Sequence, residues 1–199
     1  PVHVRSSFTD KQGTWVRNQD EIDRDETMEQ AIITGIAHDR GEAKITVVGV
    51  PDRVGEAAAI FTAVADADVN IDMIVQNISR LSDVKTDISF TLPMSDGAKA
   101  IAAIEAIKDE VGFEELLYDD QIGKVSAVGV GMRSHPGVSA TFFRALAEAD
   151  VNLQMISTSE IRISVIVGAD DVDAAVRASH TAFGLDAEET ATVYAGTGR

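Results

Sequence analysis

KVSAVGVGMRSHPGVSATFFRALAEADVNLQMI, from Lys124 to Ile156, is nearly repeated at Lys44 to Ile74, which reads KITVVGVPDRVGEAAAIFTAVADADVNIDMI. The copies align without a gap except in the loop after the first strand, where the second carries two extra residues. Each copy predicts a β-branched strand, a Pro/Gly loop, an amphipathic helix opening near Gly55 or Gly137, and a second strand after Asn70 or Asn152. Such self-similarity predicts a chain built from two like units.

The segments that follow each copy complete the same pattern. After the first copy, Lys85 to Leu92 alternates as a strand with one solvated face, and Phe113 to Tyr118 reads as another strand. Between them, Ser95 and Asp96 are expected to cap a helix that runs to about Val111. Its inward residues are expected to be Ile101, Ile104, Ile107 and Val111. After the second copy we expect a strand at 161–167, a helix at 170–183 and a last strand near 191–195.

The resulting order β-α-β-β-α-β predicts two tandem ferredoxin-like α+β units, each with an antiparallel sheet and both helices on one face. The first helix of each unit should bury a stripe at three-and-four spacing. These stripes are Ala57, Ile60, Phe61 and Val64 in the first unit, and Ser139, Phe142, Phe143 and Leu146 in the second. The uncovered sheet faces and edges favour assembly within the chain and between chains.

The repeat also sets the expected domains. Residues 1–30 are polar and aperiodic, so we interpret them as a linker or as the tail of something upstream. The AIITGIA stretch from Ala31 is expected to be a short strand, whose pairing partner the pattern leaves open. We therefore expect a first domain at residues 31–120 and a second at 121–199.

Composition narrows the function classes. A net charge of −16 over 199 residues makes nucleic acid a poor partner, because phosphate binding requires a basic face. The chain has no cysteine, so disulfides and thiolate metal sites are excluded. No apolar run reaches membrane-spanning length and no signal peptide opens the sequence, which makes a cytoplasmic location the expectation.

Catalytic and metal motifs are not apparent. No nucleophile with its base, phosphate loop or carboxylate cluster can be identified. The four histidines, His3, His38, His135 and His180, form no i,i+4 pair, so we expect neither a metal nor a cofactor. Gly129-Val130-Gly131 faintly resembles a dinucleotide loop, but Ser134 replaces the third glycine and a tight turn is the better interpretation.

The loop into each first helix is more informative. Gly55 and Gly137 allow a ligand to approach the backbone, and the free N–H groups of the helix start suit an α-carboxylate. Asp52 is a candidate partner for an ammonium group. Polar atoms of a ligand have further candidate partners in Asn70, Gln76, Asn77 and Asn152. These groups together suit a free amino acid. The alternative is that the glycines only form turns, the asparagines bond their own backbone and Asp52 is a solvated loop charge.

The repeated strand, glycine loop, helix and strand resemble the ACT domain, a regulatory module that binds amino acids at domain interfaces. Longer stretches resemble the regulatory part of bacterial aspartokinase of the actinobacterial type: VNIDMIVQNIS (69–79), KTDISFTLP (85–93), LYDDQIGKVSAVGVGMRSHPGV (117–138), VNLQMISTSEIRISV (151–165) and VYAGTGR (193–199). VRSSF and GTWV within residues 1–16 resemble the end of that enzyme's kinase domain. In similar aspartokinases an internal start yields a separate regulatory subunit, and Met28 stands where such a start would fall.

The resemblance implies two effector sites at a dimer interface. The implied threonine site comprises Asp52, Arg53, Val54, Gly55, Glu56, Ala57, Asn70, Ile71 and Gln76, with Asn152 and Leu153 from a partner chain. The implied lysine site comprises His135, Val138, Ser139, Ser159 and Glu160, with Asp72 contributed across the interface. Asp72 or Glu160 would pair with the ε-ammonium group. The sequence departs from the family's usual proline, isoleucine and threonine at Val54, Leu153 and Ser139.

The implied function is regulatory. The chain would be a non-catalytic ACT pair of aspartokinase, the enzyme of aspartate 4-phosphorylation at the head of the lysine, threonine and methionine pathway. It would bind L-threonine and L-lysine for feedback inhibition, as a homodimer and with the catalytic subunit. The alternative is a stand-alone ACT module that senses amino acids or regulates another enzyme. An enzyme acting alone is the third possibility.

Overall fold

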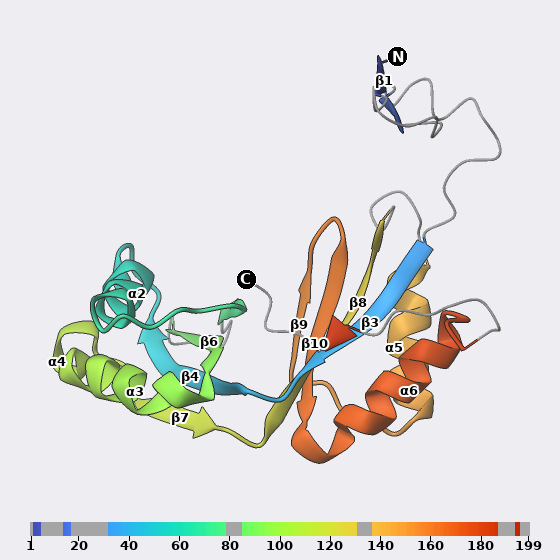
Figure 1. Ribbon diagram of the computed structural model, residues 1–199. Coiled ribbons are helices and arrows are strands. Elements are labelled where there is room, and N and C mark those ends of the chain that lie inside the picture. The colour runs from blue at the N-terminus through green and yellow to red at the C-terminus, as the bar shows by residue number, and fades with distance from the viewer. Residues whose placement is uncertain are drawn as a thin grey trace.

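The computed structural model describes residues 2–4, 14–16, 32–78, 85–130, 137–186 and 194–195. Within them, the two predicted units follow one another along the chain (Figure 1). The first unit comprises β4 (Glu42–Pro51), α2 (Glu56–Asp66), β5 (Ile74–Ile78), β6 (Lys85–Pro93), η1 (Met94–Asp96), α3 (Gly97–Ala106), α4 (Lys108–Val111) and β7 (Glu115–Asp119). The second comprises β8 (Ile122–Val130), α5 (Val138–Glu148), β9 (Met155–Thr158), β10 (Arg162–Gly168), η2 (Ala169–Asp171), α6 (Val172–Ala182) and β11 (Tyr194–Ala195), together with β3 (Ile32–Asp39).

The first sheet has the strand order β5-β6-β4-β7, and every neighbouring pair is antiparallel. Its helices cover one face, and Ile60 and Val64 of α2 are buried there as the stripe predicts. The rings of Phe61 and Phe90 meet edge to face with centroids 5.6 Å apart. The alternating apolar residues of β4 and β6 therefore bind both helices to the sheet.

The second helix region of this unit differs from the expected single helix. The helix breaks at Ile107, whose backbone (φ −105°, ψ 10°) leaves the helical range, and α4 resumes at Lys108. Ile104 and Val111 are still buried, so the apolar spacing holds across the break. Asp96 makes no side-chain capping bond, because the 3-10 turn η1 leads into α3 instead.

The second sheet has the order β11-β3-β8-β10-β9. β3 pairs antiparallel with β8 over Ile32 to Asp39, so this strand belongs to the second sheet although the expected boundary assigned it to the first domain. β11 pairs in parallel with β3 rather than lying directly beside β8. In the predicted β-α-β-β-α-β order, the last strand of the unit would pair with the free edge of β8. Here β3 already occupies that edge, so β11 pairs with β3 instead.

The apolar stripe of α5 is shifted from the expected one. Phe142 and Leu146 are buried as predicted, but Ser139 is exposed and Ala145 takes the buried position. Ser139 lies in the first turn of α5, whereas Phe142, one turn later, packs in the core with its ring centroid 6.3 Å from that of Phe183.

The two units meet through their open sheet faces. The helices lie on opposite outer flanks, and the short connections from β3 to β4 and from β7 to β8 cross from one unit to the other (Figure 1). Between the sheets, Met73, Ile122, Met155 and Ile166 form a small buried cluster with Val75 packed against it. Assembly of the open faces within the chain is therefore confirmed.

The segment before β3 was expected to be a linker or the tail of an upstream domain. Its described residues form β1 (Val2–Val4) and β2 (Thr14–Val16), which pair antiparallel as a two-stranded ribbon. Within the described ranges, no helix is both long and apolar enough to cross a membrane.

Candidate effector-binding site

The same glycine corner opens the first helix of each unit. Gly55 has φ 107° and ψ −21°, and Gly137 has φ 118° and ψ −24°. A Cβ at either position would have no atom within 4 Å, so both corners open to free space. Neither helix has a side-chain cap at this residue. The leading N–H groups of α2 and α5 therefore remain suited to an external carboxylate.

The residues predicted for threonine divide between the two units. Asp52 and Val54 are exposed in the loop after β4, where Arg53 pairs with Glu56 at 2.6 Å. Gln76 is exposed on the edge strand β5, opposite Ile88. The remaining members lie as follows: Ala57 packs on the first core, Asn70 and Ile71 lead into β5, and Asn152 and Leu153 precede β9 in the second unit.

The residues predicted for lysine lie around α5 and the β9–β10 turn. Val138 and Ser139 form the first turn of α5, and Ser159 and Glu160 form the hairpin turn. Ser159 closes that turn, since its N–H donates to the Arg162 carbonyl at 2.7 Å and its hydroxyl to the same oxygen at 3.3 Å. His135 lies outside the described residues.

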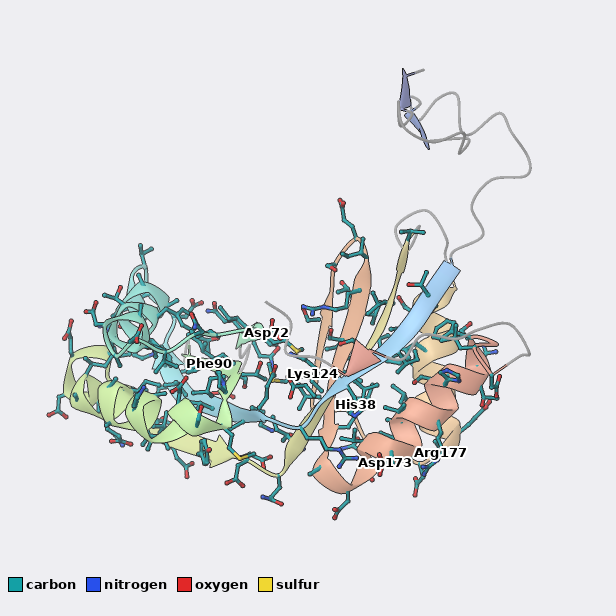
Figure 2. The ribbon with its side chains drawn as sticks, viewed as in Figure 1. His38, Asp72, Phe90, Lys124, Asp173 and Arg177 are labelled. Carbon is teal, nitrogen blue, oxygen red and sulfur yellow. The ribbon has the colours of Figure 1, made fainter. Side chains whose placement is uncertain are left out.

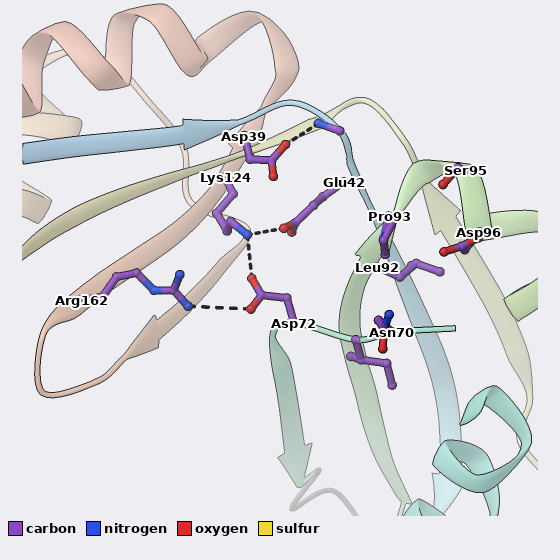
Figure 3. A pocket seen from close by; sticks show the side chains of 12 residues that line it. Asp39, Glu42, Asn70, Asp72, Leu92, Pro93, Ser95, Asp96, Lys124 and Arg162 are labelled. Carbon is purple, nitrogen blue, oxygen red and sulfur yellow. Dashed lines mark hydrogen bonds and ion pairs between the residues drawn. The ribbon is translucent and has the colours of Figure 1, made fainter. Parts of the chain in front are cut away.

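Asp72 lies in a cavity between the two units of one chain. This inter-unit cavity has a volume of about 780 Å³, which is within the range of small-molecule sites. Its lining residues are Asp39, Gly41, Glu42, Asn70, Ile71, Asp72, Leu92, Pro93, Ser95, Asp96, Lys124 and Arg162 (Figure 3). Asn70, Ile71 and Asp72 are thus the three predicted site residues that line it.

An ion-pair network crosses this cavity. Lys124 Nζ donates to Asp72 Oδ2 at 2.7 Å and also bonds Glu42, while Arg162 lies 3.8 Å from the other oxygen of Asp72 (Figure 3). Figure 2 shows Lys124 and Asp72 where the two units adjoin. Burial opposes the charged form of Lys124, but the hydrogen bonds and charges of Asp72 and Glu42 outweigh it and raise the pKa of Lys124. Lys124 therefore remains an ammonium ion between two carboxylates.

Three members of this network, Glu42, Lys124 and Arg162, were not predicted as site residues from the sequence. Lys124 occupies the same repeat position as Lys44, which binds Gln154 of the other unit and lies 3.5 Å from Asp119. The sequence does contain one signal for this network: the first copy has Asp72 where the second has the neutral Gln154, so only one of the two equivalent lysines can pair with a carboxylate at this position.

Comparison with known proteins agrees with this architecture. A family model described as ACT domain matches residues 45–107 and 125–183, one range in each unit. The chain belongs to the ACT-domain family. This ACT pair is 59% identical over 199 residues to an aspartokinase of Mycolicibacterium smegmatis, covering 100% of this chain but 47% of that relative.

Solved structures locate the match within such enzymes. The ACT pair is similar to the regulatory subunit of aspartate kinase from Thermus thermophilus in its ligand-free form, with 40% identity, a TM-score of 0.72, and coverage of 76% of this chain and 98% of that one. A structure of aspartokinase alpha and beta subunits matches at 47% identity with a TM-score of 0.71, again covering 76% of this chain and 98% of that one. The ACT pair therefore corresponds to the regulatory part of aspartokinases, and the catalytic domain is not among these 199 residues.

Proposed function

We propose that this ACT pair regulates an aspartokinase by binding L-threonine and L-lysine at an interface between two copies of the chain. Catalysis, the phosphorylation of the aspartate side chain, would belong to an associated catalytic domain or subunit in the cytoplasm. The observation that supports the proposal most directly is the match over 98% of the regulatory subunit of aspartate kinase from Thermus thermophilus.

The glycine corners support amino-acid ligands. Both corners have free space beyond the backbone and uncapped helix N–H groups, which favours a carboxylate. In the proposed threonine site, Asp52 binds the ammonium group beside the Gly55 corner. In the proposed lysine site, the Gly137 corner and the Ser159–Glu160 turn face Asp72 of the partner.

Exposed apolar residues beside these loops support a dimer interface. Val54 next to Gly55 is 106% exposed, and Ile161 next to Glu160 is 58% exposed. Ile74 and Ile156, at equivalent repeat positions, are exposed on β5 and β9 at the edges of both sheets. Contact between copies would cover these side chains.

We place the domain division at residue 120, as the repeat predicts, with β3 assigned to the second domain.

The test is reconstitution. The chain is mixed with a separately expressed aspartokinase catalytic part, and kinase activity is measured with threonine, lysine, both or neither. Inhibition that requires both this chain and an effector is the expected result. Kinase activity in the mixture that does not respond to either amino acid would contradict the proposal. Calorimetry with each of the twenty amino acids identifies the effectors independently of the kinase.

A further inference from the structure

The two units contact each other through a pair of crossing contacts that the repeat makes equivalent. Lys44 and Lys124 occupy the same position in the two copies, and so do Asp72 and Gln154. Each lysine bonds the other unit: Lys44 Nζ bonds the Gln154 side-chain oxygen, and Lys124 Nζ bonds Asp72 at 2.7 Å. The contacts therefore differ mainly in charge, since only one of them pairs an ammonium ion with a carboxylate across the units.

The Lys124 ammonium is held more closely than a surface ion pair. Its side chain is 12% exposed and its second carboxylate, Glu42, is 9% exposed. Glu42 Oε2 is buried and has no hydrogen-bond partner among the described residues. Both carboxylates line the inter-unit cavity, and Figure 3 shows the ammonium between them. A buried carboxylate that lacks a partner for one oxygen stabilises a cation strongly.

This arrangement is an ammonium-binding position that the chain fills with its own side chain. A free lysine carries the same aminobutyl group as Lys124. One buried carboxylate, Glu42, a second that is 37% exposed, Asp72, and an adjoining cavity suit the side-chain ammonium of such a ligand. Asp72, which the proposed function assigns to the lysine effector, is therefore already neutralised within the chain.

We propose that Lys124 is an internal competitor of the lysine effector. Its ammonium occupies the position formed by Glu42 and Asp72, and incoming lysine displaces it. The inference rests on the proposed function, which supplies lysine as the effector, and it adds Glu42 to the site as the second carboxylate. Because the displaced side chain joins the two units, occupancy by lysine also releases the ion pair that holds them together.

The first test measures lysine affinity by calorimetry on the full chain. Lys124→Met keeps the length of the side chain and removes its charge, so both carboxylates become available to the ligand. Lysine should then bind about tenfold more tightly, while threonine affinity is unchanged. Lys44→Met is the matched control, because Lys44 holds the equivalent repeat position but its partner in the other unit is the neutral Gln154 and its carboxylate partner, Asp119, belongs to its own unit; it should leave lysine affinity unchanged. If circular dichroism shows that Lys124→Met does not fold, Lys124→Gln is used in its place, and the same tenfold rise in lysine affinity is expected.

Equal or weaker lysine binding by the Lys124 variant, with normal binding by the wild type, overturns the inference and leaves the proposed function standing. If neither the wild type nor any variant binds lysine, the assignment of lysine as an effector is overturned, and the role of Lys124 as its competitor is overturned with it.

A second probe tests the ammonium position without the effector. In Lys124→Ala, which keeps only the Cβ of the side chain, n-propylammonium should raise the thermal midpoint, because it replaces the missing aminopropyl group between the two carboxylates. The wild type and Lys44→Ala should not respond. Stabilisation of all three chains alike, or of none, overturns the inference.

Discussion

Replacing Gly55 by alanine should lower the free energy of unfolding through backbone strain alone. Gly55 has φ 107°, a conformation that L side chains rarely adopt, yet an added Cβ would have no atom within 4 Å. The added methyl group therefore makes no steric clash, and backbone strain alone should lower the free energy of unfolding by about 1–3 kcal/mol. Gly137, with φ 118° and equally open space, should lose the same amount.

Gly184 separates backbone strain from ligand binding. It has φ 66° after α6, and a Cβ there also has nothing within 4 Å. Gly184→Ala should lower stability by about 1–2 kcal/mol, without affecting either effector. Gly55→Ala should also weaken threonine binding, because its methyl group would occupy the space from which a carboxylate reaches the helix N–H groups.

The assays are urea unfolding followed by circular dichroism, with unchanged m-values, and threonine calorimetry on each folded variant. A Gly55→Ala chain as stable as the wild type would refute the strain argument. Equal threonine affinities in Gly55→Ala and Gly184→Ala would remove the glycine corner from the site.

Four further outcomes are expected. Asp52→Ala should weaken threonine binding by about 1.5–3 kcal/mol and leave folding intact, since Asp52 is exposed; unchanged affinity by calorimetry would remove it from the site. Analytical ultracentrifugation at micromolar concentration should show a dimer, and a monomer with both effectors saturating would contradict the interfacial sites. If both effectors favour one closed arrangement, each raises the affinity of the other by the same factor, about 5- to 150-fold; superimposable threonine isotherms with and without lysine would exclude coupling within this chain. The pKa of Lys124 is raised above its ordinary value of 10.5 in the folded chain. The stability that its ion pairs contribute is therefore fully present below pH 10.5 and is lost as the pH rises through the pKa of Lys124 in the folded state. Lys124→Met should abolish this pH dependence in alkaline unfolding curves.

The elements that local patterns determine could be predicted from the sequence. The stripe of Ile60 and Val64 and the alternation of β6 follow from helical and strand periodicity, which need no knowledge of the partner. The glycine corners are also local, since a positive φ favours glycine wherever it occurs. The pairing of β3 could not be predicted this way, because an apolar strand such as Ile32–Asp39 fits the open edge of either sheet.

The same limit applies to the candidate site. Asp72 was found through resemblance, but no local pattern shows that Lys124 lies buried beside Glu42, 82 residues earlier in the chain. That contact depends on how the two units pack. Repeat comparison identifies the positions that differ between the copies, and these are where the packing becomes unequal.

The inequality of the copies determines which inter-unit contact a ligand can open. Glu42 and Asp72 on the ionic side correspond by repeat to Ile122 and Gln154 on the other, where Ile122 joins Met73 and Met155 in the buried cluster. A cationic ligand cannot replace any group in an apolar cluster, because the cluster contains no charged side chain. An ammonium ion held between carboxylates, by contrast, can be replaced by the ammonium group of a ligand. Lysine would therefore release the units on one side only, and the apolar cluster would remain as the pivot about which they reorient.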